Sequence, residues 1–83
     1  MARRKKLKII ESKLGRERAW GVYWQGQNLI EIDYRQKAKR YCNTALHEML
    51  HHFFPNASEF KVTRTSSQMA TELWKLGFRK IEK

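Results

Sequence analysis

The chain has 83 residues, enough for one small domain, and an apolar fraction of 41% with three Trp, three Tyr and four Phe argues against intrinsic disorder. A single cysteine excludes an internal disulfide, and no apolar run approaches the roughly 20 residues of a membrane span, so we expect a cytoplasmic protein without a membrane partner. The formal net charge of +10 makes nucleic acid a candidate partner.

Positive charge is concentrated at the amino end of the chain. Residues 1–8 carry basic side chains and no acidic one, the basic residues being Arg3, Arg4, Lys5, Lys6 and Lys8. Such a run is typical of a solvated arm, and it would hold phosphate groups through non-specific, salt-sensitive contacts. We therefore divide the chain into a disordered basic arm, residues 1–8, and one domain, residues 9–83.

Strands are predicted in the first half of the domain. Residues 7–14 alternate imperfectly, and we favour a strand there over a short helix. Ala19–Trp24 and Asn28–Asp33 are rich in β-formers and flank a glycine-bearing turn at Gln25–Gln27, which indicates a β-hairpin.

Alternation along each hairpin strand predicts which side chains face the core. Successive side chains of a strand point to opposite faces, so Ile30 and Ile32 point together to the core. Trp20, Val22 and Trp24 share a face of the first hairpin strand, and we expect them to pair across from the two isoleucines.

The apolar period changes after Asp33 to that of a helix. Residues 34–54 follow this helical pattern, and Pro55 ends it. Residues 34–37 could instead form a turn with Asp33 as its cap.

A second amphipathic helix is predicted over residues 59–76. Ser58 has the character of its N-cap, and Gly77 sits where a C-cap glycine belongs. The Thr and Ser residues within 63–67 lower helix propensity and could split this helix. The order of elements predicts an α+β domain, with a small, mostly antiparallel sheet packed on the first helix and a C-terminal helix after it.

The first predicted helix carries the motif His47-Glu48-Met49-Leu50-His51, which has H-E-x-x-H spacing. Residues four apart lie on one face of a helix, so His47 and His51 can direct two imidazoles at one metal ion, with Glu48 beside them. Both histidines fall outside the apolar arc of this helix, so they face away from the core. We predict a Zn²⁺ site here, with Glu48 as general base, over the alternative of a solvated histidine face.

A catalytic zinc needs a third protein ligand. Glu59 is the first choice, because an antiparallel second helix would begin close to the turn that holds His51. Glu72 is the alternative third ligand if residues 63–67 form a loop, since on a continuous helix it would extend past the metal. His52 turns towards the apolar side, and we expect it to pack or to support a ligand.

The segment from residue 21 to residue 54 resembles the upper half of a zincin metallopeptidase. Its Ile-Glu-Ile-Asp strand, residues 30–33, followed by the motif helix is similar to the order found in SprT-like proteases and minimal gluzincins. The gluzincin resemblance implies a glutamate third ligand on a following helix. SprT-like proteins usually bring a histidine there, and no histidine follows His52 in this chain. The resemblance also implies that an exposed strand edge pairs with an extended substrate.

The predicted function is therefore zinc-dependent hydrolysis of a protein or peptide, a metallopeptidase activity in which Glu48 activates the attacking water. The alternative is a small basic nucleic-acid-binding module with a structural or vestigial metal site. A third possibility joins the two, as a peptidase recruited to nucleic acid by the arm. Peptide cleavage that survives Glu48→Gln would overturn the peptidase mechanism. A binding module would bind DNA or RNA with steep salt dependence and keep that binding in Glu48→Gln, whereas truncation of residues 1–8 would weaken it.

Overall fold

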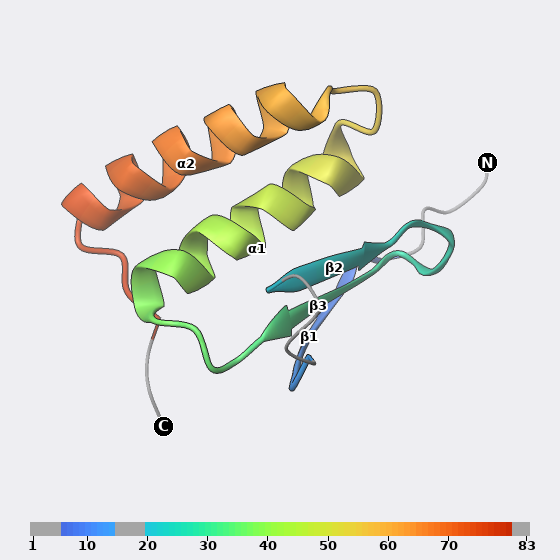
Figure 1. The fold of residues 1–83 in the computed structure, drawn as a ribbon, viewed down its shortest axis with the longest axis horizontal. Coiled ribbons are helices and arrows are strands. Elements are labelled where there is room, and N and C mark those ends of the chain that lie inside the picture. Colours follow the sequence, from blue (N-terminus) through green and yellow to red (C-terminus); the bar gives the residue numbers. More distant parts are fainter. Residues whose placement is uncertain (1–5, 15–19, 81–83) are drawn as a thin grey trace.

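The structure, a computed structural model, describes residues 6–14 and 20–80 of the chain. In chain order its elements are β1 (Lys8–Ser12), β2 (Gly21–Trp24), the short 3-10 helix η1 (Gln25–Gln27), β3 (Leu29–Asp33), α1 (Ala38–Phe53) and α2 (Glu59–Lys75). They form three layers, because α1 lies between the sheet and α2 (Figure 1). The predicted α+β class is confirmed. Neither α-helix of the described ranges is long and apolar enough to cross a membrane.

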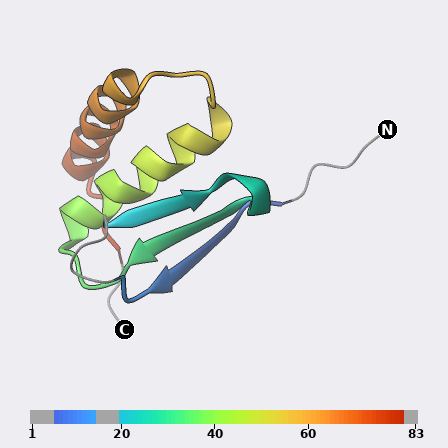
Figure 2. The same ribbon diagram turned by 45° about the vertical axis from the view of Figure 1, so that its right-hand side comes forward.

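The sheet has the strand order β1-β3-β2, so β3 is central (Figure 2). β2 pairs with β3 antiparallel, as the predicted hairpin requires, whereas β1 pairs with β3 parallel. The expectation of a mostly antiparallel sheet is therefore wrong, and the sheet is mixed. The β2–β3 hairpin has a local sequence signal in the turn that joins its strands. A parallel pair has no such signal, because its strands are joined by a long connection, which here contains β2 itself.

The hairpin register decides which side chains face α1. It pairs Gly21 with Ile32, Val22 with Glu31, Tyr23 with Ile30 and Trp24 with Leu29. Ile30 and Ile32 are fully buried, as predicted. The expected pairing of Val22 and Trp24 with these isoleucines is wrong, since directly paired residues share a face and Val22 and Trp24 lie opposite other residues. Strand alternation alone does not specify register, and an offset of one residue exchanges the two faces.

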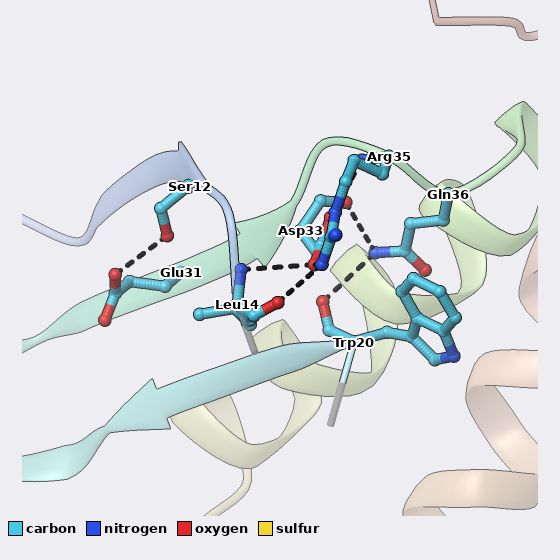
Figure 3. Close-up of polar contacts among 7 residues, drawn as sticks. All are labelled: Ser12, Leu14, Trp20, Glu31, Asp33, Arg35 and Gln36. Carbon is cyan, nitrogen blue, oxygen red and sulfur yellow. Dashed lines mark hydrogen bonds and ion pairs between the residues drawn. The ribbon is translucent and has the colours of Figure 1, made fainter. Parts of the chain in front are cut away.

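Helix α1 begins at Ala38 rather than at residue 34, because residues 34–37 form the turn that the sequence allowed. Asp33 is 1% exposed, and its carboxylate accepts hydrogen bonds from the Arg35 backbone N–H at 2.9 Å and from the Arg35 guanidinium at 2.9 and 2.6 Å (Figure 3). The backbone N–H of Leu14 donates to the same carboxylate at 3.1 Å. These bonds close the turn and tie it to the end of β1.

Gln36 links the same turn to β2 and to α1. Its side-chain amide donates to the carbonyl oxygens of Trp20 at 3.1 Å and Asp33 at 3.0 Å (Figure 3). The hydroxyl of Thr44, on α1, donates to the amide oxygen of Gln36 at 2.8 Å. One buried side chain therefore connects three elements around the start of the helix that carries the motif.

Helix α2 runs unbroken through residues 63–67, so the split that their composition allowed does not occur. Ser66 is 1% exposed, and its hydroxyl donates to the carbonyl of Thr63 at 3.1 Å, which satisfies it within the helix. Ser58 caps the helix as predicted, accepting from the Lys61 N–H at 3.1 Å.

Gly77 ends α2 as predicted. Its φ of 92° lies in the left-handed region that favours glycine. The N–H of Gly77 donates to Trp74 at 3.0 Å, and that of Phe78 to Leu73 at 3.1 Å, the two bonds of a Schellman motif. In the hairpin, by contrast, Asn28 rather than Gly26 has positive φ, at 48°.

The amino end of the domain differs slightly from the predicted boundary. β1 begins at Lys8, which pairs with Leu29, so the last residue assigned to the arm belongs to the sheet. Lys6 and Lys8 are both exposed. The other predicted nucleic-acid contacts, Arg3, Arg4 and Lys5, lie outside the described residues.

Candidate metal centre

Helix α1 places His47 and His51 one turn apart on one face, as four-residue spacing requires. Their Nε2 atoms are 3.2 Å apart, and the two rings meet edge to face with centroids 4.9 Å apart. Both side chains are partly buried, with exposed fractions of 24% and 28%. The motif therefore directs two imidazole nitrogens at one point.

Glu59 reaches the same point from α2. It is the first residue of that helix, and the short connection after α1 turns the chain back so that α2 packs along α1 (Figure 1). One carboxylate oxygen lies 2.9 Å from Nε2 of His47, and the other lies 3.2 Å from Nε2 of His51. Glu59, the first choice of third ligand from the sequence, is therefore the glutamate that lies beside the two histidines.

The spacing of these atoms suits a metal ion. Ligands at about 2.0–2.1 Å from a tetrahedral zinc lie about 3.3 Å from one another. The separations here are 2.9, 3.2 and 3.2 Å, and ligand atoms of all three residues lie within 4.8 Å of one another. Two imidazole nitrogens and a carboxylate form a donor set of the kind that zinc sites use.

Glu48 lies beside this cluster in a different environment. The residue is 9% exposed, hydrogen-bonds to none of the described residues and lines a cavity. Burial raises the pKa of the Glu48 carboxyl above its ordinary value of 4.5, while the neighbouring His47 and His51 favour its ionised form and the Glu59 carboxylate opposes it. The arrangement leaves Glu48 free to exchange a proton with a molecule in the cavity.

Gly21 lets β2 pass directly over α1 at this point. A Cβ atom added to Gly21 would lie 2.6 Å from Cγ2 of Thr44 and 3.2 Å from Cγ of Glu48. The first distance is shorter than real contacts of that kind, so a side chain at this position would displace the helix residues. Sequence reasoning missed this role. A glycine inside a strand pattern was the available signal, because it often marks a close approach of another backbone.

A cavity of about 600 Å³ opens beside Glu48. Trp20, just before β2, and Gly21, its first residue, line one side of the cavity. Helix α1 contributes His47 and Glu48, and the middle of α2 contributes Thr63 and Ser66. Its size is within the range of small-ligand sites. The side chain that the motif identifies as a base thus faces a space that a substrate can occupy.

The remaining predicted residues lie away from the cluster. Glu72 is exposed and 3.4 Å from Lys75, and the continuous helix carries it about 20 Å along the axis from Glu59. The loop that would have brought it to the metal is absent from α2 as described.

His52 packs as expected, with Nδ1 at 2.8 Å from the hydroxyl of Tyr23 and the two rings edge to face.

No protein-family model, curated protein or solved structure matches this chain. The site is therefore interpreted from its own residues. The facts that bear on its chemistry are the donor set, the donor spacing, the buried carboxylate and the adjoining cavity.

Proposed function

We propose that this chain is a zinc-dependent peptidase that hydrolyses amide bonds in a protein or peptide. The observation that carries the proposal is the convergence of His47, His51 and Glu59 at ligand spacing, beside Glu48 at the wall of a cavity. A buried carboxylate next to two imidazoles has no evident structural purpose, because it forms no hydrogen bond with the described residues.

Each residue has a defined role in this reaction. His47, His51 and Glu59 would hold the metal, and a zinc ion bound there would supply a Lewis acid that acidifies water and polarises the scissile carbonyl. Glu48 accepts the proton of the attacking water and delivers it to the leaving amine. Its geometry supports this role, because a residue adjacent to the first ligand on the helix lies beside the metal rather than on it.

The sheet offers a place for an extended substrate. β2 is an edge strand of the described sheet, and its first residue lines the cavity. A peptide added alongside β2 would gain main-chain hydrogen bonds and would enter the cavity next to Glu48.

The test compares zinc content and peptide cleavage in the parent and in Glu48→Gln. Both proteins are expected to retain about one zinc per chain, and cleavage of a mixed fluorogenic peptide set should fall by about 10²- to 10⁴-fold in the variant. Glu72→Gln is the matched control, because it removes an exposed glutamate far from the cluster. Cleavage by Glu48→Gln at the parent rate, or a parent that cannot be loaded with zinc, would refute the proposal.

A further inference from the structure

We infer that the cavity selects a substrate that carries a carboxylate group a few residues from the scissile bond. This inference rests on the proposed function and deepens it, because it assigns the substrate class of the same site. The observations behind it are the unpaired cations at one end of the cavity and the scarcity of negative charge along its walls.

One face of α1 forms the cavity wall from end to end. Arg40, Thr44 and Glu48 follow one another at four-residue steps, and all three line the cavity. Lys39 lines it next to Arg40. The axial distance from Arg40 to Glu48 is about 12 Å, so the two cations lie at the opposite end from the proposed general base.

The two cations have no acidic partner in the described part of the chain. Within residues 6–14 and 20–80, no ion pair involves Lys39 or Arg40. Five acidic side chains have partners elsewhere: Glu11 with Lys80, Glu31 with Trp24, Asp33 with Arg35, Glu59 with the histidines and Glu72 with Lys75. Arg40 lies over the ring of Trp20, 5.4 Å from its centroid, which holds the guanidinium at the rim. An anion that enters the cavity would therefore meet a cation already in place.

The rest of the wall suits a polar, anionic group. Asn43, Thr63 and Ser67 add an amide and two hydroxyl groups to the lining, and Glu48 is the single acidic residue among the described residues that bound the cavity. An arginine fork is well matched to a carboxylate, since it can donate two parallel hydrogen bonds. A substrate with a positively charged group here would face two like charges without compensation.

The distance predicts where the carboxylate lies in the substrate. An extended peptide advances about 3.3 Å per residue, so about 12 Å corresponds to about four residues. The long side chains of Lys39 and Arg40 shorten that distance. The recognised group is thus a side-chain carboxylate two to four residues from the scissile bond, or the terminal carboxylate of a short peptide.

The experiment uses the zinc-loaded full chain and peptides that differ only in charge. Glu is compared with Gln at each of four positions on either side of the bond, and a free carboxyl terminus is compared with an amide. We expect kcat/KM to be about tenfold higher for the carboxylate at one position or at the terminus, because hydrogen bonds to charged groups are the stronger ones. The ratio should shrink as salt is added.

Variants assign the effect to the cavity. Arg40→Gln combined with Lys39→Gln should reduce the Glu to Gln ratio towards one. Lys61→Gln, which removes an exposed charge of α2 outside this cavity, should leave the ratio as in the parent. The inference would be overturned if Lys61→Gln reduced the Glu to Gln ratio as much as the double variant does.

A binding measurement separates failure of this inference from failure of the peptidase proposal. Labelled Glu and Gln peptides are titrated against zinc-loaded Glu48→Gln and followed by fluorescence anisotropy. If the parent cleaves peptides but neither assay distinguishes Glu from Gln, the inference fails and the peptidase stands. If no peptide is cleaved but the Glu peptide binds about tenfold more tightly, the carboxylate site stands alone. The inference would also be overturned if a single-stranded oligonucleotide bound at Lys39 and Arg40 more tightly than the Glu peptide.

Discussion

At the scale of single residues, Glu59 occupies its place for two separate physical reasons. As the first residue of α2 it puts a negative charge where the helix dipole favours one. The helix dipole does not explain why Glu59 lies near two histidines. One of its carboxylate oxygens is 2.9 Å from Nε2 of His47, and the other is 3.2 Å from Nε2 of His51. With 67% of its side chain exposed, this carboxylate could have pointed to solvent. Its approach to the two rings is what a metal ligand would show.

Glu59→Gln should therefore weaken zinc binding, and Glu72→Gln should not. We expect the first substitution to raise the zinc dissociation constant by more than about 100-fold, because even groups that only support a ligand contribute about 10- to 100-fold. Competition with a chromogenic chelator measures both constants. Equal affinities for the two variants would remove Glu59 from the ligand set, and a loss confined to Glu72→Gln would reverse the assignment.

At the scale of elements, the turn between β3 and α1 positions the motif helix. Asp33 accepts hydrogen bonds from Leu14 and Arg35, and Gln36 donates one to Trp20 (Figure 3). Gln36 also accepts a hydrogen bond from Thr44 of α1. Hydrogen bonds from Arg35 hold the pKa of the Asp33 carboxyl well below its ordinary value of 3.8. Hydrogen bonds of this turn therefore link the sheet to the second turn of α1.

This link predicts a dependence of stability on pH. A depressed pKa in the folded state means that ionised Asp33 stabilises the fold above about pH 4, and that this contribution is lost as the pH falls below that value. Asp33→Asn should be less stable than the parent at pH 7. The difference between the two urea midpoints should shrink at pH 3, whereas Glu72→Gln should track the parent. A constant difference across this range would show that Asp33 acts only by packing.

At the scale of the whole molecule, the apolar core is thin. Its buried apolar residues in the described ranges are Ile30, Ile32, Val62 and Ala70. The first two lie between the sheet and α1, and the other two belong to α2. The candidate metal centre joins the beginning of α2 to the last turns of α1, so a bound ion would cross-link the two helices.

Zinc should accordingly raise the thermal midpoint. A ligand at 100 times its dissociation constant stabilises the native state by about 2.7 kcal/mol, which corresponds to about 10 °C or more for a domain of this size. Differential scanning fluorimetry with zinc, and again after chelation, measures the shift. His47→Ala should unfold at the same temperature in both conditions. An identical midpoint for the parent with and without zinc would mean that the cluster binds no metal in the folded state.

Local patterns in the sequence were sufficient for the parts of this protein that depend on neighbours in the chain. The spacing of His47 and His51 places them on one helix face wherever that helix lies. Ser58 and Gly77 mark the two ends of α2 through bonds that reach only a few residues. The β2–β3 hairpin follows from one short turn.

Tertiary structure alone decided what depends on contacts between distant segments. The parallel pairing of β1 with β3 and the register that turns Val22 and Trp24 from the core face have no local signal. Gly21 within a strand pattern indicated a close approach, but not that Glu48 is the residue buried beneath it. Helix length allowed Glu59 to be ranked above Glu72, but only the packing of α2 on α1 brings its carboxylate to the histidines. The physical reason is the range of the interactions, since backbone hydrogen bonding and capping act within a few residues, whereas register, burial and cavity shape arise when separate elements pack.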